Sequence, residues 1–377
     1  RQFVEVLRDG AGKTARTQPW RIAVRRSDPA RSVLHAFSVG TKKTHVWQVT
    51  RVAFVDATGG DEEGVDEGGL TSEMYTLLFR ELTRPSEEND LFEGTPQGVG
   101  VLPKAGACAD ALRAVGRALR KCVLDDRPVG RGFARFLFEY LADAHERTVF
   151  ANAASALSAL ADYDADLAER WGQLLVTPIE GLALSDFDGG ASDAPVPASA
   201  SHFGRAILAG CRHRLLGCRR ESLEAIRGGF VEHVDLSIQL AAFSPSHRAR
   251  MLRGKVEVGA EELLACFDMP PSLQLAYDPG GVVSDAPRLF KEVVEERLGP
   301  SERLNLLEWA TARRALPANG LQTRIRLRPY HGANDGDLPM VHTCTHEVHL
   351  PPYSSCDVLA HKLRQAIAHR HDGFHTA

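Results

Sequence analysis

The stretch LPMVHTCTHEVHLPPY, residues 338–353, contains one thiol, Cys344, close to segments that have the pattern of strands. Residues 323–328 and residues 347–350 each alternate apolar and polar side chains, which predicts half-buried strands. Cys344 is therefore predicted to lie on a loop between these strands, where a thiol can be exposed.

The residues around Cys344 allow nucleophilic chemistry. His342 and His346 lie two residues to either side, and a nearby imidazole favours the thiolate, which is the form that attacks. A lone Cys is nevertheless more often a small buried hydrophobe than a nucleophile. Cys344 is thus a candidate nucleophile, whereas Cys122 and Cys266 lie in helical apolar patterns and are predicted to be core residues.

Three other roles for Cys344 can be compared with its surroundings. Phosphatase chemistry requires a His directly before the Cys and an Arg six residues after it, but His342 is two before and Leu350 stands at the Arg position. A papain-type protease requires a downstream Asn, and no Asn follows Cys344. Zinc binding stays open as a minor alternative, because strand neighbours point to opposite faces and only some candidate ligands can converge. These candidate ligands are His342, Cys344, His346 and His349.

The last ~95 residues have the pattern of a small α+β unit that is large enough to fold alone. Ser284, with Pro287 in the first turn, begins one predicted helix, and a second runs over residues 301–312. A final helix follows Ser354, with Asp357 as the capping acid three residues later.

The preceding residues are predicted to be mostly helical, with a strand over residues 46–55. Glycines 228 and 229 are predicted to end the helix that precedes them. Residues 186–201 and 278–281, rich in Gly, Pro and small polar residues, are predicted to be linkers. Helical spacing of apolar residues predicts helices over 30–37, 112–122, 133–144, 153–175 and 222–230.

Composition excludes several classes of protein. The net charge is only −4, which gives no indication of nucleic acid as a partner, and no apolar run approaches the length that spans a bilayer. The chain has 7 cysteines, an odd number, with no CxxC pair, so we expect no disulfide framework and a cytoplasmic, possibly nuclear, location. The first residues show no signal-peptide pattern and no initiating Met, so we expect sequence upstream.

The carboxy-terminal motifs, taken together, resemble the small lobe of HECT-type ubiquitin ligases. This resemblance rests on their order along the chain, which ends in a closing helix. The matching residues are Leu316-Pro317, Asn319-Gly320, Leu338-Pro339, His342-Thr343-Cys344, Leu350-Pro351-Pro352-Tyr353 and Gly373-Phe374.

The earlier part of the chain is similar to the large lobe of the same family. The most specific match is Asp66-Glu67-Gly68-Gly69-Leu70-Thr71-Ser72-Glu73. From bare physics, Gly68-Gly69 is a tight turn, and we interpret Asp66 and Glu73 as structural. Further matches are Arg25-Arg26, Leu91-Phe92-Glu93, Asp125-Asp126-Arg127-Pro128, Arg227-Gly228-Gly229-Phe230 and Phe243-Ser244-Pro245.

The resemblance implies an α+β, bilobal HECT fold. The large, mostly helical N-terminal lobe would be residues 1–282, and the small α/β C-terminal lobe, with the catalytic cysteine, would be residues 283–377. A flexible hinge near residues 278–285 would let the small lobe face two partners in turn. The conjugating enzyme would dock on residues 133–179 of the large lobe.

The resemblance also implies the activity. Cys344 would accept ubiquitin from a conjugating enzyme as a thioester and pass it to a lysine of a protein substrate, without cofactor or metal. His342 and Thr343 are supporting residues of the motif. Phe374 would help to place ubiquitin for the second transfer, or it would only anchor the terminal segment in the core.

The chain departs from the family pattern at three places. Thr345 and His346 stand where the family usually has an aromatic and an Asn, and Ala312 stands where it usually has Gly. After Phe-Ser-Pro the chain has Ser246-His247-Arg248 in place of acidic and leucine residues. The alternative is therefore a HECT-like module that binds conjugating enzyme or ubiquitin without transfer.

Overall fold

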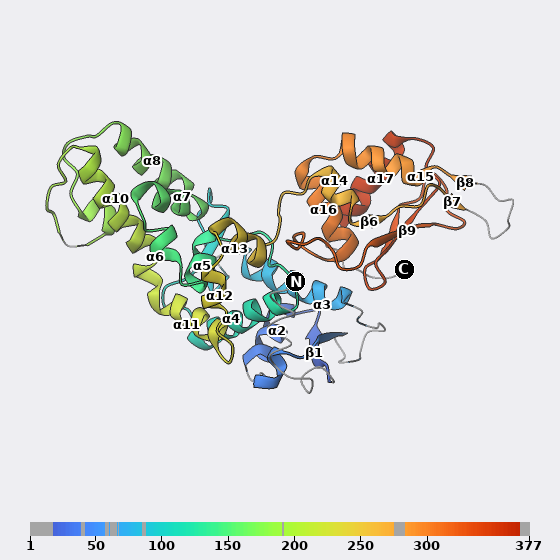
Figure 1. Cartoon of the computed structure of the whole chain (residues 1–377), viewed down its shortest axis with the longest axis horizontal. Helices are drawn as coiled ribbons and strands as arrows, with labels where there is room; N and C mark the ends of the chain where they lie inside the picture. The colour runs from blue at the N-terminus through green and yellow to red at the C-terminus, as the bar shows by residue number, and fades with distance from the viewer. Residues whose placement is uncertain are drawn as a thin grey trace.

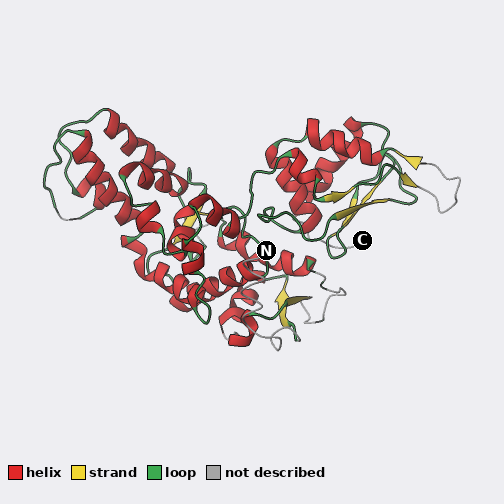
Figure 2. Cartoon of the chain, in the orientation of Figure 1, coloured by secondary structure: helices red, strands yellow, loops and turns green. Residues whose placement is uncertain are grey.

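The computed structural model describes residues 18–38, 42–56, 60, 66, 68–84, 88–190, 192–274 and 283–369. Buried hydrophobic side chains in it form two clusters. The first cluster runs from Trp20 to Leu252 and the second from Val258 to Ile367. Figure 1 shows the corresponding parts of the chain, which are joined after helix α13. The fold mixes helix and sheet, as an α+β class requires, with most of the strands short (Figure 2).

The first part is mostly helical. Its strands form a parallel pair, β1–β2, and a three-stranded sheet in the order β3-β4-β5. Its helices are α2 (Pro29–Ser38), η2 (Lys43–Val46), α3 (Gly69–Leu82), α4 (Ala109–Leu124), α5 (Arg135–Leu141), α6 (His145–Thr148), α7 (Ala153–Tyr163), α8 (Ala165–Val176), α9 (Ser185–Asp188), α10 (Ala200–Leu215), η3 (Gly217–Arg219), α11 (Arg220–Val231), α12 (Ser237–Ala241) and α13 (Pro245–Leu252). Its strands are β1 (Trp20–Arg25), β2 (Thr50–Val55), β3 (Phe92–Glu93), β4 (Gly100–Pro103) and β5 (Gly132–Phe133).

Helices α4 and α11 pack in very close contact, and two glycines make this contact possible. A Cβ on Gly116 would lie 1.9 Å from the carbonyl oxygen of Ile226, and one on Gly229 would lie 2.0 Å from that of Arg113. The prediction that Gly228-Gly229 ends a helix is therefore wrong, since α11 continues to Val231. Glycine serves here for close approach of two helices and not for a stop.

The predicted helix over 153–175 is two helices. Helix α7 ends at Tyr163, and the side chain of Asp164 caps α8 by accepting a hydrogen bond from the backbone N–H of Leu167 at 3.0 Å. Asp is a strong N-cap residue, and this local signal ends one helix and starts the next. Similarly, the helix predicted over 133–144 begins after β5 and ends at Leu141.

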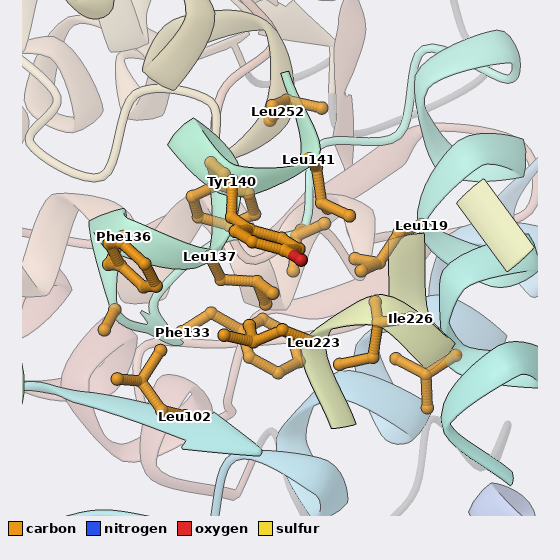
Figure 3. Close-up of a cluster of buried hydrophobic side chains, with 14 of the residues drawn as sticks. Leu102, Leu119, Phe133, Phe136, Leu137, Tyr140, Leu141, Leu223, Ile226 and Leu252 are labelled. Carbon is orange, nitrogen blue, oxygen red and sulfur yellow. The ribbon is translucent and has the colours of Figure 1, made fainter. Parts of the chain in front are cut away.

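Large side chains from several elements fill the centre of the first cluster (Figure 3). Helix α5 contributes one wall and helices α4 and α11 the opposite one. The labelled residues of this core are Leu102, Leu119, Phe133, Phe136, Leu137, Tyr140, Leu141, Leu223, Ile226 and Leu252.

The second part contains a four-stranded sheet in the order β10-β11-β9-β6. Strand β11 pairs with β10 antiparallel and with β9 parallel. The strands and helices predicted for the last ~95 residues have counterparts here, whereas β10 was not predicted. These elements are α14 (Ala260–Leu264), β6 (Phe267–Asp268), β7 (Leu273–Gln274), β8 (Val283–Ser284), α15 (Ala286–Glu292), the π-helix η4 (Val293–Arg297), α16 (Pro300–Thr311), β9 (Ile325–Pro329), β10 (Met340–His342), β11 (Glu347–Leu350) and α17 (Cys356–Ala368).

The hinge was predicted near residues 278–285, and the structure does not support that position. Residues 275–282 lie outside the described residues, but β7 and β8 on either side pair antiparallel, with Leu273 opposite Ser284. Leu273 and Ala286 both belong to the second cluster, so the chain leaves and re-enters the same part. The passage between clusters falls instead between Leu252 and Val258, ahead of the predicted lobe boundary at 282/283. Turns and linkers share a Gly- and Pro-rich composition, so this composition alone does not locate the hinge.

Among the described residues, no helix is both long enough and apolar enough to cross a membrane.

Candidate functional site around Cys344

Cys344 lies in the turn that connects β10 to β11, residues 343–346. Strand β10 was not predicted, because three residues are too few for an alternating pattern to stand out. The antiparallel pairing places His342 opposite Glu347, directly at the base of the turn. Within the turn, Thr343 and His346 are buried, while Cys344 is partly exposed. The turn therefore leaves the thiol and Thr345 accessible and packs Thr343 and His346 inward.

Two departures from the family pattern, Thr345 and His346, have structural roles in this turn. His346 has a positive φ of 55°, a left-handed conformation that Asn and His tolerate better than most residues. Strand β9 holds the same turn from the side: the backbone N–H of Arg326 donates to the His346 carbonyl at 2.8 Å, and its Nη2 donates to the Thr345 carbonyl at 3.3 Å. The turn is thus fixed to the sheet next to the thiol.

His342 contacts another histidine rather than the thiol. Its ring lies 5.0 Å from that of His349, edge to face, and no hydrogen bond joins it to Cys344 in the described residues. Burial lowers the pKa of His349, and the neighbouring His342 lowers it further. Glu347 accepts a hydrogen bond from Arg328 at 3.0 Å and pairs with Arg326 at 3.2 Å. Burial alone raises the pKa of Glu347, but these two arginines outweigh it, so the net pKa is lowered.

The structure gives no support to the zinc alternative. In the part of the chain that is described, the histidines around Cys344 do not gather with it, or with carboxylates, into a group that could hold a metal ion.

The backbone of Cys344 lies against the start of α3 in the first part. A Cβ placed on Gly69 would lie 2.7 Å from the Thr343 carbonyl oxygen and 2.8 Å from the Cys344 Cα. Only a residue without a side chain allows the turn to come this close. Sequence reasoning had treated the two glycines only as a turn and missed this contact, because nothing in the pattern shows what faces them across the fold.

Asp66 and Gly68 shape the segment that carries Gly69. Gly68 adopts φ 112°, which side-chain-bearing residues rarely do, so the tight turn predicted here is confirmed. The carboxylate of Asp66 accepts hydrogen bonds from the backbone N–H of Val52 at 2.8 Å and of Gly68 at 2.7 Å, and from the Thr71 hydroxyl at 2.5 Å. The structural role predicted for Asp66 is therefore confirmed.

The loop after α16 makes further contact between the two parts. Ala312, which stands where the family usually has Gly, has φ 54°, the left-handed region that favours Gly. Its carbonyl accepts a hydrogen bond from the Thr76 hydroxyl at 2.6 Å, and the Gln322 amide donates to the Asp126 carboxylate at 3.2 Å. α3 and the loop after α4 thus hold the second part, which includes the turn that carries Cys344, against the first part.

Most of the other thiols differ from Cys344 in environment. Cys122 and Cys266 are buried, as predicted, and burial raises the pKa of each. Burial likewise raises the pKa of Cys211 to about 12. Cys356 begins α17, and burial and a hydrogen bond to Glu292 raise its pKa. A raised pKa depletes the thiolate, so these four are poor nucleophiles.

Two further predicted features lie elsewhere. Phe374 falls outside the described residues. The predicted docking segment, residues 133–179, includes α7 and α8, and at its end Val176 and Ile179 are exposed apolar side chains, 84% and 48% respectively. In Figure 1, α8 and α10 lie at the end of the first part that is remote from the second part.

Comparisons with known proteins find a domain model and several relatives that this chain resembles. Residues 199–377 match the model of the HECT domain, described as a ubiquitin-transferase. The chain is 26% identical over 272 residues to a bifunctional serine/threonine-protein kinase/NEDD4-like E3 ubiquitin-protein ligase of Dictyostelium discoideum, a match to 70% of this chain and 13% of that protein. It is 33% identical over 159 residues to the E3 ubiquitin-protein ligase hecd-1 of Caenorhabditis elegans, covering 41% of this chain and 6% of that protein.

A longer match is to the E3 ubiquitin-protein ligase Smurf1 of Drosophila melanogaster, which is 24% identical over 342 residues, 81% of this chain and 30% of that protein. The chain thus spans less than a third of the length of these relatives. On these matches residues 199–377 are similar to a HECT domain, and the relatives that match the chain are named as E3 ubiquitin-protein ligases.

Proposed function

We propose that this chain accepts ubiquitin from a conjugating enzyme as a thioester on Cys344 and transfers it to a lysine of a protein substrate. The Cys344 thiolate attacks the thioester carbonyl, forms a new C–S bond, and the thiolate of the conjugating enzyme leaves. A neutral lysine amine then attacks the new thioester, an amide bond forms, the amine loses its proton, and the Cys344 thiolate leaves. The first step exchanges one thioester for another, so neither cofactor nor metal is needed.

The observation that carries this proposal is the placement of Cys344. It is partly exposed in the turn between β10 and β11, and Arg326 holds that turn from the neighbouring strand. An accessible thiol on a firmly held turn suits a nucleophile that must present the same acyl group to two reaction partners. His342 and Thr343 shape this turn in the proposal, without acting as general bases.

The conjugating enzyme is proposed to dock on the helical segment that ends in Val176 and Ile179. Exposed apolar side chains are typical anchors of protein interfaces. Helix α8 of this segment is remote from the second part, which carries the Cys344 turn, in the arrangement of Figure 1. Loading of Cys344 therefore requires the second part to move, and the arrangement described here suits the later transfer step.

The hinge for this movement is proposed at residues 253–257, between the two hydrophobic clusters. Hydrogen bonds join this segment to both parts: the backbone N–H of Gly130 donates to the Arg253 carbonyl at 2.9 Å, and Lys255 and Leu316 exchange backbone hydrogen bonds at 2.8 and 3.0 Å. Gly254, with φ 78°, supplies a residue that tolerates large backbone changes.

Two further expectations belong to this proposal. Phe374 would contribute to the second transfer. We expect the protein in the cytosol or nucleus.

A HECT-like binding module is the second candidate. It was suggested by Thr345 and His346, but both have structural roles in the turn, and the relatives found by comparison are named as ligases. These observations favour transfer over binding alone.

The test uses activating enzyme, a panel of conjugating enzymes and ubiquitin, followed by a non-reducing gel. We expect a thiol-sensitive ubiquitin adduct on the chain that is lost in Cys344→Ala and retained in Cys356→Ala. An adduct lost in Cys356→Ala and retained in Cys344→Ala would mean that the nucleophile is misassigned. Absence of any adduct with every conjugating enzyme, in a chain that still binds them, would favour the binding module.

A further inference from the structure

A small cavity of about 10 Å³ lies where the two parts meet. Helix α3 forms one side, the loop after α4 a second, and the loop after α16 closes it. The volume suffices for one water molecule or one monatomic ion. The lining residues are Ser72, Tyr75, Thr76, Phe79, Arg127, Pro128, Val129 and Arg313.

Two arginines line this cavity, one from each part of the chain. Arg313 is only 6% exposed, and its buried Nε–H has no hydrogen-bond partner in the described residues. The buried Nε–H of Arg127 has none either. Unsatisfied buried donors are rare in proteins, and each carries a substantial desolvation penalty.

The charges of the two arginines are also poorly compensated. Neither guanidinium forms an ion pair with any described carboxylate; Arg313 donates at 3.4 Å to the Asp126 backbone carbonyl, and Arg127 at 3.4 Å to that of Gly68. Burial and, after it, the neighbouring Arg127 lower the pKa of Arg313 to about 9 against the opposing effect of Asp126. The charge of Arg313 is therefore buried next to the like charge of the half-buried Arg127, which is costly without a counterion.

The hydroxyls around the cavity are committed to other acceptors. Ser72 donates to the Gly68 carbonyl at 2.8 Å, Tyr75 to the Asp125 carboxylate at 3.1 Å, and Thr76 to the Ala312 carbonyl at 2.6 Å. A water molecule would satisfy an Nε–H but would leave the charge uncompensated. A monovalent anion would accept a hydrogen bond from the Nε–H and would also compensate the positive charge.

We propose that this cavity is a binding site for a small monovalent anion of halide size, held between Arg127 and Arg313. A phosphate or carboxylate group is too large for it. Arg127 also reaches Gly68, next to the glycine on which the Cys344 turn rests, so the bound anion would stabilise the contact between the two parts. The proposal does not depend on ubiquitin transfer, because it concerns only how the two parts are held together.

The first test compares thermal unfolding of the chain in sodium chloride or bromide with unfolding in sodium gluconate at equal ionic strength. Gluconate does not fit the cavity. For the wild type we expect the unfolding midpoint to be higher in halide, by about 2 °C or more, and to rise with halide concentration. Arg313→Gln and Arg127→Lys should lose this difference, while the exposed Arg324→Gln should keep it.

Equal midpoints in halide and gluconate for the wild type would overturn the proposal, as would an undiminished halide effect in both cavity variants. A crystal grown with bromide provides a readout that needs no variant. An anomalous scattering peak between the Arg127 and Arg313 guanidiniums supports the site. A cavity without that peak, in crystals that hold the two parts in contact, contradicts it.

Discussion

At the residue scale, Gly69 connects the segment with the most specific resemblance to the HECT pattern to Cys344, the proposed nucleophile. It is the first residue of α3, and the backbone of Thr343 and Cys344 occupies the space where its side chain would be. A single methyl group at this position would push the Cys344 turn away from α3. The glycine therefore determines where the thiol can lie during transfer.

We predict that Gly69→Ala slows discharge of ubiquitin from Cys344 to lysine by about tenfold or more, because a displacement near 1 Å can cost up to 10²-fold. Loading from the conjugating enzyme should change little, since it uses another arrangement of the two parts. Single-turnover kinetics of each step measure this. Gly204→Ala is the matched control, because its added Cβ meets nothing within 4 Å. Equal discharge rates in the two variants would show that the contact has no part in transfer.

His349 is predicted to make stability depend on pH. Burial and His342 lower its pKa, while Glu347 raises it and Arg328 lowers it again. The folded chain thus binds fewer protons at His349 than the unfolded chain, so the contribution is complete above the unfolded pKa of about 6.5 and is lost as the pH falls through the folded pKa.

The free energy of unfolding should therefore decline from about pH 7.5 to about pH 5.5 more steeply in the wild type than in His349→Gln. Chemical denaturation at each pH measures the difference. Replacing the exposed His213 by Gln serves as the control. The same pH slope in His349→Gln and the wild type would contradict the assignment.

At the scale of elements, a residue that departs from the family pattern, Arg248 of α13, forms a buried ion pair with Glu139 of α5. Arg248 donates to Glu139 at 2.6 Å, and both side chains are about 98% buried. Arg248 also donates to the carbonyl of Phe243. The unusual residue after Phe-Ser-Pro is thus one half of a buried ion pair that joins the two helices.

Arg248→Met is predicted to cost about 3–5 kcal/mol of unfolding free energy, because it leaves the Glu139 charge buried and uncompensated. The double variant Arg248→Met with Glu139→Leu should recover part of that loss. The exposed Arg250→Met should change stability by less than about 0.5 kcal/mol. Urea denaturation gives the unfolding free energy of all three variants. A double variant as unstable as Arg248→Met would contradict the claim that the uncompensated Glu139 charge causes the loss.

Helix α8 offers the second prediction at this scale. Val176→Asp should lower the rate of ubiquitin loading on Cys344 by about tenfold, because it places a charge on the apolar surface proposed for the conjugating enzyme. The unfolding midpoint should not change, since this side chain is already 84% exposed. Ile238→Asp on α12, at a residue 72% exposed, is the control. Equal loading by both variants would place the docking surface elsewhere.

The sequence predicted those elements that have a strong local signal. Strand β11 matches its predicted range, and α2 and α16 lie within one residue of theirs, the uncertainty usual for helix ends, while α4 begins three residues before its predicted start. Errors arose where one residue type serves two purposes: Gly229 permits close packing instead of ending α11, and Asp164 divides one predicted helix into two. The position of Cys344 on a loop next to a strand was predicted from the sequence. Its contact with Gly69 was not, because sequence patterns report neighbours along the chain and not across the fold.

At the scale of the whole molecule, two hydrophobic clusters meet through a small polar contact. Thr76, Gln322 and the two arginines around the cavity contribute to it, whereas neither cluster extends across it. A contact of this kind is compatible with two parts that separate and re-form. The proposed relay requires such movement, because the proposed docking helix α8 lies at the end of the first part that is remote from the second part, which carries the Cys344 turn (Figure 1).

The central claim is that Cys344 carries ubiquitin, and peptide mapping by mass spectrometry of the adduct formed from a charged conjugating enzyme tests it most directly. In the wild type, the ubiquitin tail should map to the peptide with Cys344 and be released by thiol. In Cys344→Ser it should map to the same position as an ester that resists thiol and is cleaved by hydroxide. An adduct on any other residue in the wild type would contradict the assignment of Cys344 as the nucleophile.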